Sequence, residues 1–263
     1  MIGSPHKGVI ADRFMITNLA GSGGSGAVYR AFDILQQRPV AIKLLHHRGQ
    51  ASPNQERLLR EARILSSLQH PGIVSYITHG QTADGSTYLA LEWLDGEDVA
   101  CRLRSGPLSI ADCLLLLLHV SEALSLVHGR GITHRDLKPS NLFLRDGRVD
   151  QVTLLDFGHA RERRDPAAAA PASRSRPATF SGTPGYLAPE CAHGHRDITP
   201  AADIFSLGSV LYECLTGVPA FSGGNVTAVL AKIFFEELLP ARQLRPDTPA
   251  SLDALLLRML AKD

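Results

Sequence analysis

The chain has 263 residues, 44% of them hydrophobic, with 27 basic and 26 acidic side chains and a net charge of +1. This length and apolar content suffice to bury a substantial core, and the near-neutral charge argues against nucleic acid or a membrane surface as the main partner. The four cysteines show no paired metal-ligand spacing, which predicts buried, reduced thiols.

Residues 1–12 contain glycine, serine and proline and are interpreted as a flexible lead-in without a signal-peptide pattern. The most apolar run, Leu114 to Leu118, is far shorter than a membrane span. We therefore expect a cytoplasmic domain without a membrane segment.

Residues 13–92 are predicted to form a small, mostly β unit that contains one helix. The helix opens at Ser52-Pro53, and Gln55 completes a capping box. Its apolar stripe has helical spacing and consists of Leu58, Ala62, Leu65 and Leu68. Apolar segments bounded by turn residues predict five strands, at residues 14–19, 27–31, 39–45, 73–77 and 87–92.

After Gly96 the pattern becomes helical. Ser109 and Asp112 form a capping box for a long apolar helix that runs to about His128. The Arg-, Ala- and Pro-rich residues 161–178 have little to bury and are predicted to form an insertion within a loop. Three more helices are predicted to open at Thr199-Pro200, Asn225 and Thr248-Pro249.

A glycine-rich segment lies between the first two predicted strands. Glycine allows the backbone to approach phosphates and to point its N–H groups at them. A dinucleotide fingerprint would require a helix directly after the glycines, whereas Val28-Tyr29-Arg30 continues as a strand. Taken alone the segment could equally be a flexible hairpin; its position before the motifs described next favours a loop that covers nucleotide phosphates. Its members are Gly21, Ser22, Gly23, Gly24, Ser25, Gly26, Ala27 and Val28.

The most specific motif is the run His134-Arg135-Asp136-Leu137-Lys138-Pro139-Ser140-Asn141, followed by Asp156-Phe157-Gly158. It places a carboxylate, an ammonium group and an amide on one loop and a second carboxylate downstream. These groups suit a general base, a phosphate contact and two metal ligands in phosphoryl transfer. Taken singly, they are more often a turn aspartate, a surface lysine and a capping asparagine, but together and in this order they favour catalysis.

With Val40-Ala41-Ile42-Lys43, these motifs resemble eukaryotic-type protein kinases, most closely the bacterial serine/threonine kinases, over residues 13–263. The resemblance implies an α+β, bilobal kinase-like fold that binds ATP between its lobes. The expected N-lobe is small, mostly antiparallel β with one helix, at about residues 13–92. A hinge at about 92–97 and a larger helical C-lobe at about 98–263 would follow.

The same resemblance assigns the ATP contacts. Lys43 would hold the α- and β-phosphates, and Glu61, preferred to Glu56, would hold Lys43. Further ATP-binding positions on the third strand and the hinge would be Ala41, Leu91, Glu92 and Leu94.

Four residues would carry the chemistry. Asp136 would act as the base or orient the substrate hydroxyl, and Lys138 would neutralise the transferring γ-phosphoryl group. Asn141 and Asp156 would bind Mg²⁺, for which Mn²⁺ could substitute.

Two motifs imply a protein substrate. Lys138-Pro139-Ser140 resembles serine/threonine kinases, since tyrosine kinases usually carry arginine and alanine there. Residues 182–190 resemble a peptide-binding segment, in which Thr183 would hydrogen-bond Asp136 and Lys138. Asp203 would hold the backbone of the catalytic loop, residues 134–141, in place. The alternatives are a pseudokinase that binds ATP as a scaffold and a small-molecule phosphotransferase.

The resemblance also implies regulation through Arg135. In related kinases this arginine binds a phosphate on the activation loop, which here is the segment between Asp156 and Glu190. Thr179 and Ser181 are the candidate phosphate acceptors. Residues 256–263 resemble the penultimate helix of the family, so the chain is expected to stop short of its natural end. Further domains would then follow residue 263, and Glu190 would lack the arginine that pairs with it in related kinases.

Overall fold

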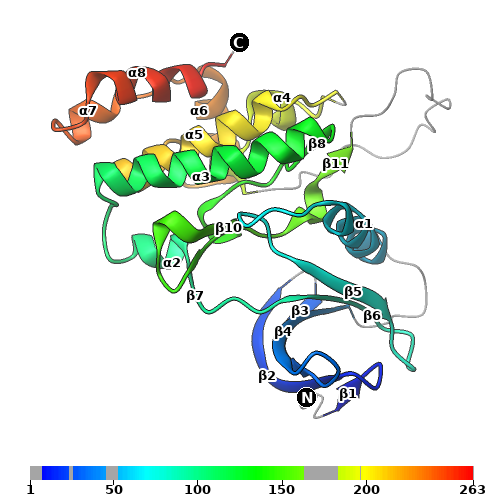
Figure 1. Cartoon of the computed structure of the whole chain (residues 1–263). Coiled ribbons are helices and arrows are strands. Elements are labelled where there is room, and N and C mark those ends of the chain that lie inside the picture. Colours follow the sequence, from blue (N-terminus) through cyan, green and yellow to red (C-terminus); the bar gives the residue numbers. More distant parts are fainter. Residues whose placement is uncertain (1–7, 24–25, 46–52, 163–182, 196, 263) are drawn as a thin grey trace. The chain divides into compact units, whose positions relative to one another are not determined.

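The computed structural model describes residues 8–23, 26–45, 53–162, 183–195 and 197–262. The chain divides into two compact units, Met1–Asp95 and Gly96–Asp263. Among the described residues, the first unit is mostly β with one helix, and the second is mostly helical (Figure 1). The predicted α+β class is therefore confirmed.

The first unit is built on one antiparallel sheet whose strand order is β1-β2-β3-β4-β6-β5. In β3, buried side chains alternate strictly with partly exposed ones, as expected for a sheet with one covered face. The strands are β1 Val9–Ile10, β2 Phe14–Gly23, β3 Gly26–Asp33, β4 Arg38–Leu45, β5 Tyr76–Gln81 and β6 Thr87–Glu92.

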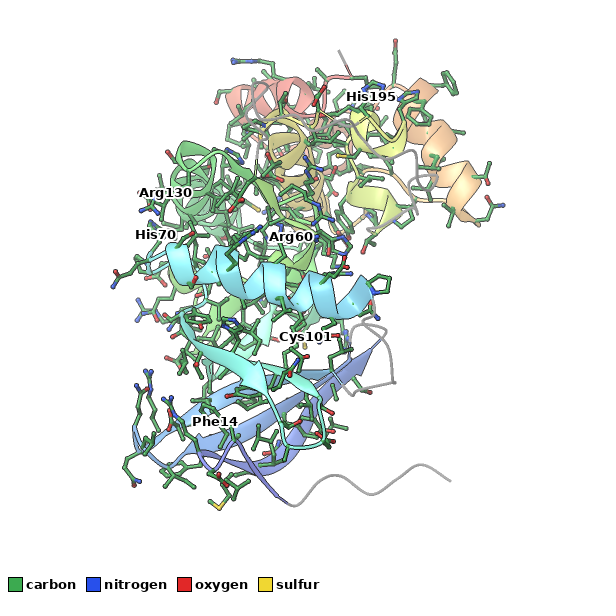
Figure 2. All side chains as sticks on the ribbon, turned by 90° about the vertical axis from the view of Figure 1, so that its right-hand side faces the viewer. Phe14, Arg60, His70, Cys101, Arg130 and His195 are labelled. Atoms are coloured by element: carbon green, nitrogen blue, oxygen red, sulfur yellow. The ribbon has the colours of Figure 1, made fainter. Side chains whose placement is uncertain are left out.

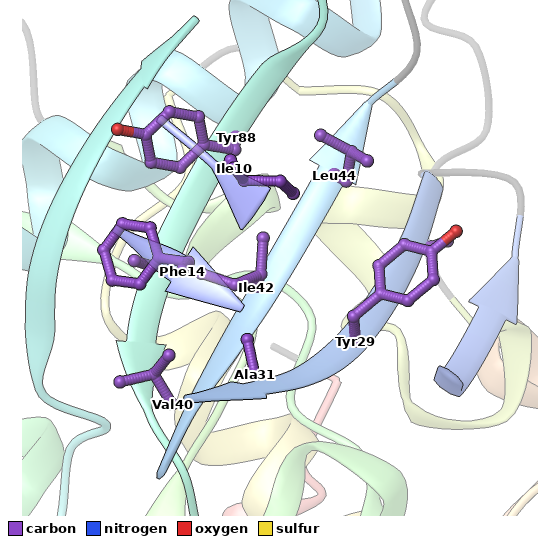
Figure 3. Close-up of a cluster of buried hydrophobic side chains, with 10 residues drawn as sticks. Ile10, Phe14, Tyr29, Ala31, Val40, Ile42, Leu44 and Tyr88 are labelled. Carbon is purple, nitrogen blue, oxygen red and sulfur yellow. The ribbon is translucent and has the colours of Figure 1, made fainter. Parts of the chain in front are cut away.

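A cluster of buried side chains forms the core of this sheet (Figure 3). The rings of Phe14 and Tyr88 meet edge to face, with centroids 5.9 Å apart. In this geometry the positive edge of one ring lies against the negative face of the other, which stabilises the pair. The cluster consists of Ile10, Phe14, Ala27, Tyr29, Ala31, Val40, Ile42, Leu44, Tyr88 and Ala90.

Two predictions about this sheet were wrong. The expected lead-in contains strand β1, in which Val9 pairs with Met15 and Ile10 pairs with Phe14. Burial of the Ile10 side chain in the core stabilises this short strand. The strand predicted at residues 73–77 begins at Tyr76, because the chain turns before it through a hydrogen bond from the N–H of Ile73 to the carbonyl of His70.

Helix α1, Pro53–Ser67, is the predicted helix of the first unit. It packs against β5 and β6. All four members of its predicted apolar stripe are buried. Its expected capping residue, Ser52, lies outside the described residues.

In its described residues, the second unit contains the four predicted helices and three further ones that are only four or five residues long. A helix of one turn is too short to show a 3.6-residue period, so these three were missed. The helices are α2 Val99–Leu103, α3 Ile110–Gly129, α4 Pro189–Ala192, α5 Ala201–Thr216, α6 Val226–Phe235, α7 Ala241–Leu244 and α8 Ala250–Met259.

Short strands also lie in the second unit. A three-stranded sheet has the order β10-β9-β7, and β11 pairs with β8. These strands are β7 Gly96–Asp98, β8 Ile132–Thr133, β9 Leu142–Arg145, β10 Val152–Leu154 and β11 Arg161–Glu162.

Helix α3 begins at the predicted capping box. The Ser109 hydroxyl accepts the N–H of Asp112 at 3.0 Å and donates to the Asp112 carboxylate at 2.7 Å. The helix packs against α5 and β10. By length and composition alone its 20 residues could also cross a membrane, a test that core helices pass as well. The apolar element is thus longer than the run from Leu114 to Leu118 suggested.

The four cysteines are free thiols, as predicted. Cys113 and Cys214 are buried, whereas Cys101 and Cys191 are only partly buried, which corrects the expectation that all four would be buried. Burial raises the pKa of the Cys113 and Cys191 thiols to about 12. Both therefore remain protonated at neutral pH.

Candidate active site

The glycine segment forms the β2–β3 hairpin. Gly21 lies opposite Val28 and Gly23 lies opposite Gly26, so a strand follows the glycines. Gly26 has φ +119°, and a Cβ there would lie 2.5 Å from the Leu44 carbonyl oxygen, so only glycine fits. The hairpin lacks the helix that a dinucleotide fingerprint requires. Gly24 and Ser25, at its tip, lie outside the described residues.

Lys43 on β4 forms an ion pair with Glu61 on α1. The Lys43 Nζ lies 2.7 Å from Glu61 Oε2, and the Glu61 side chain is 2% exposed. An isolated buried carboxylate would be costly, so the pair holds both side chains in place. Glu56, the alternative partner, is exposed on the first turn of the helix.

The residues expected near the adenine base lie on neighbouring strands. Ala41 on β4 faces Leu91 on β6. The Glu92 carboxylate accepts the N–H of Ser75 at 2.7 Å, and the Glu92 N–H donates to the Ser75 carbonyl at 3.0 Å. Leu94 is partly buried just after β6. Glu92 therefore serves the fold of the first unit through its side chain.

In the second unit, Asp136 is the centre of a polar cluster and is only 6% exposed. Its Oδ2 accepts hydrogen bonds from Lys138 Nζ at 2.9 Å and from Asn141 Nδ2 at 3.1 Å. Asn141 Nδ2 also donates to the Asp136 carbonyl at 2.8 Å. Within the described chain, Asp136 Oδ1 and Asn141 Oδ1 have no hydrogen-bond partner, so both oxygens remain available as acceptors.

Asn141 and Asp156 lie at the same end of the β9–β10 hairpin. Leu142 pairs with Leu154, and the N–H of Leu155 donates to the Asn141 carbonyl at 2.9 Å. Asp156 has the left-handed φ of +53°, and its Oδ1 accepts the N–H of Gly158. One amide oxygen and one carboxylate at this end match the hard oxygen ligands that Mg²⁺ prefers.

His134 joins the two loops. Its Nε2 lies 3.0 Å from the Leu155 carbonyl, which can only accept, so Nε2 carries the proton. Its Nδ1 then accepts the N–H of Asp136 at 3.3 Å. The ring is fully buried against Phe157, with centroids 4.7 Å apart. The imidazole thereby fixes the backbone of Asp136.

The buried side chain of Asp203 on α5 anchors the catalytic loop, residues 134–141, by hydrogen bonds. Its carboxylate is fully buried and accepts the N–H groups of His134 and Arg135, each at 2.8 Å. The Nε2 of His128, at the end of α3, lies 2.8 Å from the same carboxylate. These bonds hold Arg135 at φ +67°, a conformation that is strained for a residue with a side chain. The sequence offered no signal for His128 beyond a polar residue on an apolar helix.

Arg135 has an unused donor. Its Nε is buried and has no hydrogen-bond partner in the described chain. Burial lowers the pKa of the guanidinium, because desolvation disfavours its charge. A buried donor of this kind fits an anion. The predicted acceptors Thr179 and Ser181 lie outside the described residues.

The predicted peptide segment is anchored by a residue that sequence reasoning missed. The Tyr186 hydroxyl donates to Glu213 Oε2 at 2.5 Å, and Ser206 Oγ donates to the Tyr186 carbonyl at 2.7 Å. Burial, and then Glu213, raise the pKa of Tyr186. The bonds fasten the 3₁₀ turn Pro184–Tyr186 to α5.

Thr183 does not make its expected contacts. It is exposed and forms no hydrogen bond to Asp136 or Lys138; the Lys138 ammonium instead donates to Asp136 Oδ2 within the loop. Glu190 is partly buried and forms no ion pair with a described residue.

Comparisons with known proteins agree with this geometry. Residues 14–263 match the family model described as protein kinase domain. The chain is 36% identical over 264 residues to the serine/threonine-protein kinase pkn2 of Myxococcus xanthus, covering 99% of this chain and 31% of that protein. It is also 36% identical to PknA of Mycobacterium tuberculosis, covering 59% of that kinase. The DNA damage-responsive kinase RqkA of Deinococcus radiodurans is 36% identical, with 37% covered. The chain thus spans about a third to three fifths of these relatives.

Proposed function

We infer, from the premise that the chain belongs to the protein kinase family, that this domain is a serine/threonine protein kinase. It transfers the γ-phosphoryl group of ATP to serine or threonine hydroxyls of proteins. The observation that carries the proposal is the cluster in which Lys138 and Asn141 both donate to Asp136 Oδ2. That cluster leaves one carboxylate oxygen for a substrate hydroxyl.

The reaction assigns a task to each group of the second unit. Asp136 Oδ1 accepts the hydrogen bond of the attacking hydroxyl and takes its proton as the new P–O bond forms, while the bond from the γ-phosphorus to the bridging oxygen of the β-phosphate breaks and ADP leaves. Lys138, held 2.9 Å from Asp136, offsets negative charge on the transferring phosphoryl group. Bound Mg²⁺, or Mn²⁺ in its place, supplies charge neutralisation on the phosphates, and Asn141 Oδ1 and Asp156 would hold it.

The first unit contributes the nucleotide contacts. Lys43, fixed by Glu61, would bind the α- and β-phosphates. The glycine hairpin would direct its backbone N–H groups at them, with the tight turn at Gly26. Ala41, Leu91 and Leu94 would contact the base.

Two alternatives are less well supported. A pseudokinase that only binds ATP has no use for the complete set of Lys43, Asp136, Asn141 and Asp156. A small-molecule phosphotransferase has no use for the segment that Tyr186 fastens to α5. The geometry therefore favours turnover on a protein.

The direct test is transfer of radiolabelled phosphate from Mg-ATP to the chain itself and to a generic basic protein. We expect label on serine and threonine in both. Nucleotide binding without label on any protein would support the pseudokinase instead. Label on small alcohols or amines alone would support the small-molecule enzyme.

The Asp156→Ala variant should need more Mg²⁺ for nucleotide binding, because one of two protein ligands is lost. The measurement is a Mg²⁺ titration of nucleotide binding at fixed protein concentration. Asp146→Ala, in the β9–β10 connection outside the proposed ligand set, is the matched control. An unchanged titration of Asp156→Ala would remove this residue from the ligand set.

We further propose that activity is switched by autophosphorylation of Thr179 or Ser181. The buried, unpaired Nε of Arg135 supports this, since a phosphate adds about −1.5 to −2 charge and forms strong bonds with arginine. Such bonds can offset the roughly 1–2 kcal/mol per residue that ordering a loop costs.

The Thr179→Ala/Ser181→Ala double variant should therefore phosphorylate an exogenous protein markedly more slowly. Peptide mapping of the wild type after incubation with Mg-ATP should find phosphate at one of the two positions. Ser173→Ala/Ser175→Ala, in the Arg/Ala/Pro-rich stretch, is the control. Full activity of the Thr179/Ser181 double variant would contradict the switch.

A further inference from the structure

Arg30 and Trp93 form a stacked pair in the first unit. The guanidinium carbon of Arg30 lies 5.1 Å from the centroid of the Trp93 ring. The indole Nε1 of Trp93 donates a hydrogen bond of 2.9 Å to Asp95 Oδ1. A cation over the face of an indole and an acceptor at its N–H both match the charge distribution of the ring. The Trp93 side chain is therefore held from two directions.

Arg30 lies in line with two residues that are proposed to contact the base. It is opposite Ala41 in the β3–β4 ladder, and Ala41 is opposite Leu91 in the β4–β6 ladder. Residues opposite one another in neighbouring strands share a face of the sheet. All three are partly exposed, whereas Tyr29, the neighbour of Arg30 in β3, belongs to the buried core that contains Phe14 (Figure 2). Arg30 thus belongs to the face on which the base is proposed to lie.

The backbone just after β6 needs support from outside the sheet. The paired part of β6 ends at Glu92. In the part of the chain that the structure describes, the N–H and carbonyl groups of Leu94 form no hydrogen bond. The bond from the Trp93 indole to Asp95 spans this residue, and the stack on Arg30 ties the same indole to β3. The Trp93 side chain therefore fixes the segment that carries the Leu94 backbone.

We propose that Arg30 and Trp93 are positioning residues for the nucleotide base. They hold Leu94 so that its N–H and carbonyl groups meet the edge of a planar base that carries an acceptor beside a donor. This role rests on the proposed kinase function and deepens it by naming what fixes the base contact. The pair acts on nucleotide affinity and leaves phosphoryl transfer to the groups around Asp136.

The test separates nucleotide affinity from turnover. Arg30→Met removes the cation and keeps a long side chain beside the ring. It should raise the Kd for Mg-ADP and the KM for ATP by roughly three- to tenfold, the factor that corresponds to the loss of a cation–π contact. The kcat and the KM for the protein substrate should stay at their wild-type values. Arg30→Lys keeps the cation and should bind Mg-ADP within about twofold of the wild type.

The fluorescence of Trp93 reports on the stack directly, because it is the only tryptophan of the chain. Removing the guanidinium leaves one face of the indole to water, so the emission maximum of Arg30→Met should lie at longer wavelength than that of the wild type. Trp93→Ala removes both the stack and the bond to Asp95. It should weaken Mg-ADP binding at least as much as Arg30→Met does.

Arg38→Met is the matched control. Arg38 is an exposed arginine of the neighbouring strand β4, and its guanidinium donates to the side chain of Gln36. This variant should keep the wild-type Kd for Mg-ADP and the wild-type emission maximum.

Wild-type affinity for Mg-ADP in Arg30→Met would overturn the positioning role, and so would an unchanged emission maximum in that variant. An equal loss of affinity in Arg30→Lys and Arg30→Met would also overturn it, because the cation would then not be what holds the indole. Urea unfolding of each variant shows that the fold is kept. Failure of the wild type to transfer phosphate to any protein, with nucleotide affinities changed as expected, would instead reject the kinase function alone.

Discussion

Replacing Asp136 with asparagine should lower the rate of phosphate transfer by about 10² to 10⁴, the usual effect of removing a general base. The amide keeps the shape of the side chain and can still accept from Lys138, but it cannot take the proton of the substrate hydroxyl. ATP binding should stay nearly unchanged, because the proposed nucleotide contacts lie at Lys43 and Asp156. Single-turnover transfer and nucleotide binding measure the two effects separately.

Asp150→Asn provides the matched control. Asp150 lies in the β9–β10 connection of the same unit, and its carboxylate is 40% exposed and paired with Arg148. Exposed pairs contribute little, so this variant should transfer phosphate at the wild-type rate. If Asp136→Asn retained more than a tenth of wild-type turnover, Asp136 would not be the catalytic residue.

The Asp203→Asn variant should be destabilised by about 3–5 kcal/mol, as expected when a buried, fully paired carboxylate is lost. Both carboxylate oxygens accept backbone N–H groups, of His134 and of Arg135. An asparagine must turn its NH₂ group toward one of these donors and leave a buried N–H unsatisfied. Since small proteins are stable by only about 5–15 kcal/mol, the loss is large. Turnover should fall as well, because the loop that carries Asp136 loses its anchor.

Urea unfolding measures the change in the free energy of unfolding, and single-turnover assays measure the rate of phosphate transfer. Asp247→Asn is the control, because Asp247 is 66% exposed and pairs with Arg245 only at the surface. That variant should unfold within about 0.5 kcal/mol of the wild type. An equally small change in Asp203→Asn would show that the carboxylate is not what holds the catalytic loop.

The features that the sequence determined by itself are local. The capping box at Ser109, the cap at Asn225 and the end of α5 at Gly217 each follow from residues within one helical turn. The order of groups from Asp136 to Asn141 also follows from adjacency, since one short loop cannot separate them. The pairing of Lys43 with Glu61 followed from resemblance to a family and not from any local pattern.

The resemblance predicted that Asp203 holds the loop, and the structure confirms it, but tertiary structure alone decided the other contacts that hold the site in place. His128 and Asp203 are 75 residues apart, Tyr186 and Glu213 are 27 apart, and neither pair has a sequence pattern that marks it. The short strand Val9–Ile10 forms because the core accepts Ile10. The spacing of apolar residues along the chain reveals the period of a single helix or strand. Pairs such as these depend instead on which faces of different elements pack together. The groups of the proposed site could therefore be identified from the sequence, but most of the hydrogen bonds that position them required the fold.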